Sequence, residues 1–153
     1  AVCSDAGYPG LSDPGYRLIS EAAGLGFEIV VLPGASAIAT AIVSSGLPTD
    51  SYTFLGFPPR KKGQMARFFE NERENSHTLV LFESPFRVGK TLDSALEVLG
   101  DRMGAVCIEL TKKFERIHRG YLTDLADKFR DRKIKGEVTI VIAGNNPKFT
   151  RSG

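Results

Sequence analysis

The chain opens with the segment Ser4-Asp5-Ala6-Gly7-Tyr8-Pro9-Gly10-Leu11-Ser12-Asp13-Pro14-Gly15, which holds three glycines, two prolines and two Ser-Asp pairs. Glycine and proline at this density exclude both a helix and a regular strand. We therefore expect a strand that ends in a shaped loop, then a helix from about Pro14 with Asp13 as its N-cap. Open main-chain N–H groups near Gly7 could bond a ligand, although a plain strand-to-helix connection explains the composition equally well.

A second unit of the same kind follows. The run Phe27–Leu32 is apolar and rich in β-branched residues, which predicts a buried strand. Pro33-Gly34 interrupts it, and the segment 36–45 is apolar enough to predict a helix buried on most sides. Strands that alternate with helices indicate a parallel α/β sheet. In such sheets ligands bind beyond the carboxyl ends of the strands, where both loops would lie.

The composition changes near residue 50, where we place a domain boundary. The first part, residues 1–50, is predicted to be a partial parallel α/β sheet. The second, residues 51–144, is predicted to be an α+β domain with a mixed sheet, and residues 145–153 form a polar tail. The expected strands of the second domain are 52–57, 78–82, 105–108, 115–122 and 138–143, and its expected helices are 64–75, 86–99 and 123–132.

Composition narrows the class of protein. The 153 residues are 42% apolar and 25% charged, as in soluble globular proteins, and no apolar run is long enough to span a bilayer. Cys3 and Cys107 lack metal-ligand spacing, which predicts buried free thiols in a reducing, cytoplasmic compartment. Residues 1–50 carry a net charge of −4 and residues 51–153 one of +6. The basic part suits a polyanion such as RNA, but it also suits an ordinary solvated surface.

The motifs together resemble a known family. The opening segment, Pro33-Gly34-Ala35-Ser36-Ala37 and Ser45-Gly46-Leu47-Pro48-Thr49-Asp50 look like the tetrapyrrole methylase superfamily. Four later motifs look like its ribosomal branch, the 16S ribosomal RNA cytidine 2′-O-ribose methyltransferases. These four are Gly56-Phe57-Pro58-Pro59, Phe82-Glu83-Ser84-Pro85-Phe86-Arg87, Glu109-Leu110-Thr111-Lys112 and Lys135-Gly136-Glu137. The match extends from residue 2 to about residue 144.

The resemblance implies a two-domain enzyme that holds S-adenosylmethionine in the interdomain cleft. Residues 1–50 would then be the C-terminal half of the cofactor domain. By analogy, the cofactor would contact Ala6, Gly7, Tyr8, Leu11, Ser36, Ala37, Phe82 and Leu110. Main-chain amides would hold the methionine part, and apolar walls would hold the adenine.

This sequence departs from the family pattern in two ways. Tyr8 replaces a usual threonine and Ala35 a usual proline, while Phe86 and Ile108 replace a frequent histidine and arginine in the presumed substrate region. The family's glycine-rich first strand and the elements after it are also absent before Ala1. We therefore expect a truncated chain that by itself binds the cofactor weakly or not at all.

Methyl transfer to a ribose hydroxyl needs a group that accepts the hydroxyl proton. Candidates are Glu83, Glu109 and Lys112, which follow predicted strand ends. A carboxylate can accept the proton directly, and a partly desolvated lysine can be neutral near pH 7. The alternatives are that Glu83 caps the following helix and that Glu109 and Lys112 form an ion pair.

Four basic residues are candidates for contacts with RNA phosphates: Arg60, Lys61, Lys62 and Arg87. A solvated rim explains them equally well. His77 and His118 have no partners at metal-ligand spacing, so no metal is expected. The expected partner is ribosomal RNA of the small subunit, with no membrane and with a homodimer as the assembly. A tetrapyrrole methyltransferase of the precorrin type and a non-catalytic binding module remain alternatives.

Overall fold

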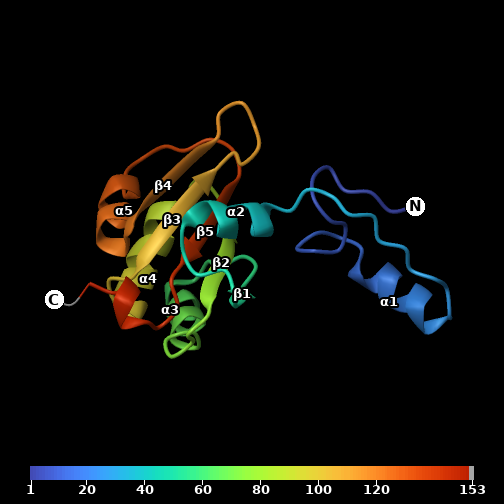
Figure 1. The fold of residues 1–153 in the computed structure, drawn as a ribbon, viewed down its shortest axis with the longest axis horizontal. Coiled ribbons are helices and arrows are strands. Elements are labelled where there is room, and N and C mark those ends of the chain that lie inside the picture. Colours follow the sequence, from blue (N-terminus) through green and yellow to red (C-terminus); the bar gives the residue numbers. More distant parts are fainter. Residues whose placement is uncertain (152–153) are drawn as a thin grey trace. The chain divides into compact units, whose positions relative to one another are not determined.

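The computed structural model describes residues 1–151 of the chain. These residues form two compact units, Ala1–Ala37 and a second unit that begins at Ile38 (Figure 1). The predicted domain boundary at residues 50 and 51 stays a prediction, since the compact units divide earlier in the sequence. Each unit is described by itself below.

The first unit contains one helix, α1 (Tyr16–Gly24). It begins two residues later than predicted, and Gly15 is its N-cap, with no side-chain hydrogen bond. The predicted cap by Asp13 is therefore wrong, because Asp13 and Pro14 lie in the bend and turn that precede the helix. None of the residues of α1 is buried.

The predicted strand Phe27–Leu32 does not form. A strand is stable only when its main-chain groups bond a neighbouring strand. No described residue of the chain supplies that neighbour here. The run is left exposed, with 78% of Leu32 and 69% of Val30 accessible to solvent. The prediction that Cys3 is buried also fails, because its thiol is exposed.

The second unit contains the mixed sheet that the sequence predicts. Its five strands are β1 (Tyr52–Phe54), β2 (Thr78–Glu83), β3 (Met103–Ile108), β4 (Arg116–Tyr121) and β5 (Val138–Ile142), arranged in the order β1-β2-β5-β3-β4. Strand β1 pairs parallel with β2, and the other pairs are antiparallel. Because β2 and β3 both run antiparallel to β5, strands β1, β2 and β3 point in the same direction.

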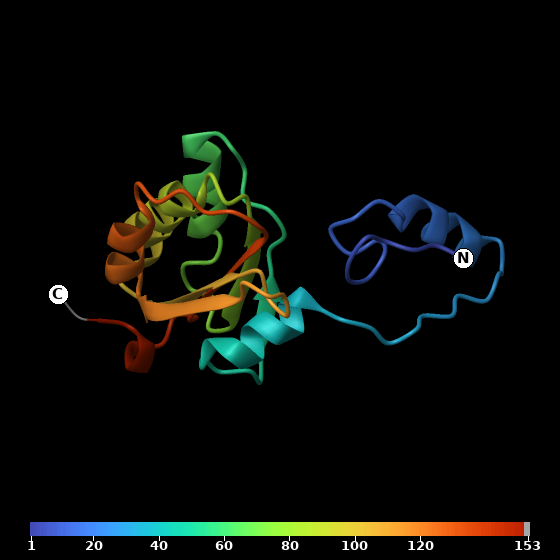
Figure 2. The same ribbon diagram turned by 90° about the horizontal axis from the view of Figure 1, so that it is seen from above.

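Helices cover both faces of this sheet. Helix α2 (Ala37–Ser45) lies on one face, and α3 (Lys62–Glu70), α4 (Val88–Leu99) and α5 (Leu122–Phe129) lie on the other (Figure 2). The expectation that α2 is buried on most sides is wrong. Only one side of the helix is buried, through Ile38, Ala41, Ile42 and Ser45, while 75% of Val43 is exposed.

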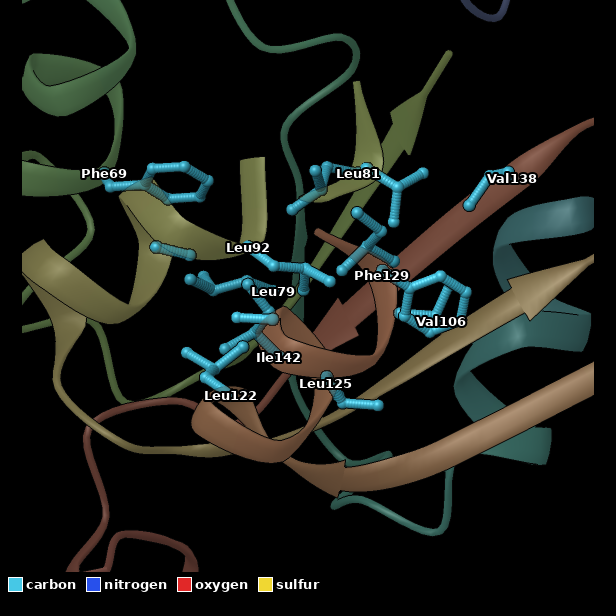
Figure 3. Close-up of a cluster of buried hydrophobic side chains, with 14 of the residues drawn as sticks. Phe69, Leu79, Leu81, Leu92, Val106, Leu122, Leu125, Phe129, Val138 and Ile142 are labelled. Carbon is cyan, nitrogen blue, oxygen red and sulfur yellow. The ribbon is translucent and has the colours of Figure 1, made fainter. Parts of the chain in front are cut away.

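Two apolar clusters hold the layers together. The larger one joins α3, α4 and α5 to the sheet and contains Phe69, Leu79, Leu92, Phe129 and Ile142 (Figure 3). The smaller one joins α2 to the opposite face, where Ile38 and Ile42 share a cluster with Val80, Cys107 and Val141. Each fully buried large aliphatic side chain contributes roughly 1.5–3 kcal/mol.

The predicted polar tail is tied to the second unit as far as residue 151. The N–H of Asn145 donates to the carbonyl of Asn75 at 2.7 Å, and the N–H of Arg151 donates to the carbonyl of Asp101 at 2.9 Å. Between them, the short 3-10 helix η1 (Pro147–Phe149) places Phe149 against the smaller cluster. These contacts fix the segment that follows β5.

Candidate cofactor and nucleic-acid site at one end of the sheet

The four motifs of the second unit meet at one end of the sheet. Strands β1, β2 and β3 all point toward this end, and Val138 at the start of β5 pairs with both Glu83 and Ile108, the last residues of β2 and β3. The segments that follow these strands and the segment 133–137 that precedes β5 therefore lie together. We call this region the motif end of the sheet.

Glu109 connects two of the motifs through its carboxylate. Its Oε1 accepts the N–H of Glu137 at 2.8 Å and lies 3.0 Å from Nζ of Lys112. Lys112 also pairs with Oε2 of Glu137 at 3.1 Å, and the N–H of Glu109 donates to the carbonyl of Glu137 at 2.9 Å. Gly136 permits this contact, because a Cβ there would stand 2.3 Å from the Glu109 carboxyl group.

These contacts fix the charges of Glu109 and Lys112. The hydrogen bond from the Glu137 N–H, followed by the one from Lys112, lowers the pKa of Glu109 below its ordinary value. Hydrogen bonds to Glu109 and Glu137 raise the pKa of Lys112. In this arrangement Lys112 is a charged, ion-paired lysine and not a desolvated neutral one. Glu109 is an ionised but weakened base.

Glu83 differs from the other two candidate bases, because its side chain is fully buried. One carboxylate oxygen accepts the N–H of Ser84 at 2.6 Å. The other accepts the hydroxyl of Thr91 in α4 and lies 3.4 Å from the guanidinium of Arg87. Glu83 therefore joins the end of β2 to α4, and its two oxygens are engaged internally.

Arg87 and the cluster of residues 60–62 have different surroundings. The guanidinium of Arg87 donates to the carbonyls of Pro58 and Pro59, at 3.0 and 2.8 Å, and so holds the loop after β1 against the loop after β2. Arg60, Lys61 and Lys62 are exposed at the start of α3. Within residues 1–151, none of these three forms an ion pair with a carboxylate.

An aromatic group stands at the motif end on the face that α2 covers. The ring of Phe82 lies 4.9 Å from that of Phe54 and 5.6 Å from that of Phe57, which is 56% exposed. Leu110 packs against the same apolar cluster. The sequence predicts Phe82 and Leu110 as site residues but not Phe54 and Phe57. Both lie in the aromatic run 52–57, which is expected to be a strand, although β1 ends at Phe54. Glu137 was also missed, although it ends a quoted motif.

The first unit brings together the other predicted cofactor residues. The hydroxyl of Tyr8 accepts the N–H of Gly34 at 3.0 Å, which joins the opening loop to the loop before α2. The hydroxyl of Ser4 donates to the carbonyls of Ala6 and Gly7, at 3.1 and 3.0 Å, and shapes the turn where Gly7 adopts a φ of 76°.

The remaining predicted cofactor residues of the first unit lie in or next to these loops. Ala6, Gly7 and Leu11 are exposed and Ser36 is half-buried, while Ala37 is the first residue of α2. The candidate cofactor residues therefore form two groups, one in each unit.

Two kinds of feature are absent among the residues that the structure describes. No helix there is both long and apolar enough to cross a membrane. In the same part of the chain, no three His, Cys, Asp or Glu side chains are grouped so that they could hold a metal ion.

Comparison with known proteins identifies the family of this chain. The family described as Tetrapyrrole (Corrin/Porphyrin) Methylases matches residues 1–126, and the chain belongs to this family. The chain is 43% identical over 148 residues to Ribosomal RNA small subunit methyltransferase I of Halalkalibacterium halodurans, covering 97% of this chain and 51% of that protein. The protein of the same name from Mycobacterium tuberculosis is 44% identical over 147 residues, covering 95% and 51%. The chain thus spans about half the length of these relatives.

Solved structures show the same fold at low sequence identity. The methyltransferase CobJ superimposes with a TM-score of 0.64 and 16% identity, covering 91% of this chain and 62% of CobJ. The cobalt precorrin-4 methyltransferase CbiF gives a TM-score of 0.55 and 20% identity, covering 84% of this chain and 59% of CbiF. These likenesses confirm the predicted α/β fold class, with its mixed sheet in the second unit.

Proposed function

We propose that the protein is an S-adenosylmethionine-dependent methyltransferase that acts on the ribose 2′-hydroxyl of a cytidine in small-subunit ribosomal RNA. The observation that carries this proposal is the identity of 41–44% to proteins named Ribosomal RNA small subunit methyltransferase I. The motifs typical of the ribosomal branch also gather at one end of the sheet, as a shared site requires. A tetrapyrrole substrate is not favoured by these relatives.

The residues present fit the cofactor. The rings of Phe57 and Phe82, together with Leu110, offer an apolar wall of the kind that accepts an adenine. In the first unit, Ala6, Gly7, Tyr8, Leu11, Ser36 and Ala37 lie in or next to two loops joined by the Tyr8 hydrogen bond. We assign main-chain contacts to these loops. When bound, S-adenosylmethionine supplies an electrophilic methyl group.

We assign the acceptance of the ribose proton to the Glu109–Lys112 pair. Both side chains reach solvent, with 20% of Glu109 and 43% of Lys112 exposed, whereas the Glu83 side chain has no exposed surface. Lys112 could act as a base only after it loses its contacts with Glu109 and Glu137, because these raise its pKa. Glu109 is ionised at neutral pH, so its carboxylate can accept a proton.

We assign phosphate contacts to Arg60, Lys61 and Lys62, which are exposed beside the same end of the sheet. Arg87 has a different role in this proposal. Its donors are bound to Pro58, Pro59 and Glu83, so it positions the loop that carries the three basic residues. The proposal also includes a cytoplasmic location, as expected for an enzyme that modifies ribosomes, and a homodimer as the assembly.

The test uses the longest open reading frame that contains this sequence. It is incubated with tritiated S-adenosylmethionine and either purified small ribosomal subunits or a precorrin, and the labelled nucleotide is mapped by its resistance to alkaline hydrolysis. We expect label at one cytidine of the RNA and none on the precorrin. Label on the precorrin alone, or cofactor binding without any transfer, would contradict the proposal.

The variant Lys112→Arg tests whether Glu109 or Lys112 accepts the ribose proton. Arginine keeps the positive charge but cannot lose its proton near neutral pH. If Glu109 accepts the proton, Lys112→Arg retains most of the turnover, while Glu109→Gln loses about 100-fold or more, as expected when a general base is removed. Loss of turnover in Lys112→Arg with activity kept in Glu109→Gln would assign the proton to the lysine instead.

A further inference from the structure

A half-open cavity of about 360 Å³ lies at the motif end of the sheet, beside the segment 132–136 that precedes β5. Its walls carry four basic side chains, from Arg116, Arg132, Lys133 and Lys135. None of these four residues was selected from the sequence as a binding residue, and the roles assigned above do not use them. We call this cavity the basic pocket.

The charge of the basic pocket is not neutralised from within. Among residues 1–151, no carboxylate pairs with Arg116, Arg132, Lys133 or Lys135. Glu109 is the one carboxylate that lines the pocket, and its charge is offset by Lys112 at 3.0 Å. Four like charges around one small cavity repel each other unless an anion binds there. The pocket therefore has the electrostatics of an anion site.

The same basic side chains act on the imidazole of His118 on β4. Its pKa is lowered from the ordinary value, first by burial and then by the charges of Lys128, Arg132 and Arg116. Two of these three charges line the basic pocket. Two of the pocket's basic residues therefore also lie close enough to His118 to disfavour its charged form.

An exposed aromatic ring stands at the same pocket. Phe114 lines it and is 65% exposed. The loop that carries Phe114 joins β3 to β4 and projects from the end of the sheet (Figure 1). The ammonium of Lys113 lies 5.7 Å from the centre of the ring. Basic side chains interleaved with an exposed ring are typical of surfaces that bind single-stranded nucleic acid, because the ring stacks on a base while the cations hold the backbone.

We propose that the basic pocket binds a phosphodiester of single-stranded RNA, with an adjacent base stacked on Phe114. The inference rests on the proposed function, since it extends the RNA-contacting surface of the same enzyme. Lys133 and Lys135 contact the phosphate from the loop, and Arg116 and Arg132 contact it from β4 and from the segment after α5. Glu109 separates this contact from Lys112, which keeps its own carboxylate partners.

The experiment measures binding of a short, fluorescein-labelled single-stranded RNA by the complete chain between about 50 and 200 mM salt. Lys133→Gln/Lys135→Gln removes two exposed charges that have no internal partner. The matched control, Arg67→Gln/Lys148→Gln, removes two exposed charges outside the pocket, one in the last turn of α3 and one in η1. Within residues 1–151, neither of these charges pairs with a carboxylate. Far-ultraviolet circular dichroism checks that both variants fold.

If the proposal holds, the pocket variant weakens binding and reduces the slope of log affinity against log salt by as much as about 0.7, the value for one phosphate contact on a single strand. The control variant leaves the slope close to that of the wild type. Phe114→Leu, which keeps an apolar side chain without a ring, weakens binding roughly fivefold or more. Equal slopes for the pocket variant and the control would overturn the phosphate contact. Unchanged affinity of Phe114→Leu would overturn the stacking.

Failure of the pocket proposal can be distinguished from failure of the proposed methyltransferase function. The 153-residue chain could bind RNA through the pocket while the protein from the longest reading frame transfers no methyl group to ribosomal RNA. In that case the catalytic proposal fails and the pocket proposal stands. If methyl transfer occurs with the same KM in the wild type and in Lys133→Gln/Lys135→Gln, the catalytic proposal stands and the pocket does not. Absence of RNA binding by the wild type overturns the pocket proposal directly.

Discussion

Gly136 shows how a single residue connects two motifs that lie far apart in the sequence. Its φ of 92° is in the left-handed region, and the Glu109 carboxylate occupies the space that a side chain would need. The carboxylate thereby reaches the N–H of Glu137 and the ammonium of Lys112. At the residue scale, the glycine is required both for its backbone conformation and for the room it leaves.

We predict that Gly136→Ala destabilises the protein and releases Glu109. The matched control is Gly46→Ala, where φ is 77° but no atom stands within 4 Å of the added Cβ. Both variants incur the backbone strain of about 1–2 kcal/mol for an L-residue in this conformation. Only Gly136→Ala also displaces the Glu109 carboxylate. Urea unfolding should therefore show a larger loss of unfolding free energy in Gly136→Ala than in the control.

The contribution of Glu109 to the free energy of unfolding depends on pH. The pKa of Glu109 is lower in the folded state, so its contribution to stability is present above its unfolded pKa and is lost as the pH falls through the folded pKa. The extra destabilisation of Gly136→Ala should therefore shrink below about pH 4. A deficit that stays constant across this range, as expected for the control, would show that Glu109 is not involved.

At the scale of elements, the helix layer depends on a close approach of α4 and α5. A Cβ at Gly89 of α4 would stand 2.7 Å from the carbonyl oxygen of Phe129 and 2.8 Å from Cα of Arg130. These are main-chain atoms, so they cannot turn away as a flexible side chain can. Glu83 and Thr91 fasten the same helix to the end of β2, and thus position the motif end of the sheet.

We predict that Gly89→Ala lowers the free energy of unfolding by about 1–3 kcal/mol, because the two helices must separate to admit the methyl group. Alanine has the higher helix propensity by about 1 kcal/mol, so propensity alone predicts the opposite sign. The control is Gly63→Ala in α3, where nothing lies within 4 Å. Thermal and urea unfolding should show that the control is neutral or more stable. Equal effects of the two substitutions would contradict the close approach.

At the scale of the whole molecule, α2 is the element whose sequence lies in the predicted first part, residues 1–50, but whose side chains pack in the core of the second unit. Residues 38–47 cover Val80, Ala105, Cys107 and Val141 on one face of the sheet. Removal of this cover would expose a contiguous apolar face, which drives association. The second unit should therefore need α2 in order to avoid association through this face.

We predict that the fragment 38–153 folds without associating through this face and that the fragment 51–153 self-associates through it. Cys107 reports the difference, because it is the one cysteine in both fragments. Burial raises its pKa to about 11, so at about pH 8 it is both protonated and covered. A thiol reagent should react slowly with 38–153 and rapidly with 51–153, and light scattering should give their masses. Equal protection of Cys107 in monomers of both fragments would show that the sheet does not need α2.

Local patterns determined most of the second unit. Periodicity located its five strands and three of its helices, with ends that differ by up to five residues, because each element there carries its own apolar pattern and finds a partner in the same unit. The sequence also identified the family through motifs, each of which is a short continuous stretch. Phe82, Leu110, Glu109 and Lys112 are predicted site residues that the structure does bring to the motif end of the sheet.

Only the tertiary structure decided the rest. Phe27–Leu32 has the composition of a strand but forms none, because a strand needs a neighbour and no pattern within six residues reports one. The structure gave Arg87 and Glu83 internal partners that lie elsewhere in the chain. It also joined Glu109 to Glu137, and gathered four basic residues from separate segments around one cavity. Composition favours a local conformation, but whether that conformation forms and which side chains meet depend on the register and direction of strands that are distant in sequence.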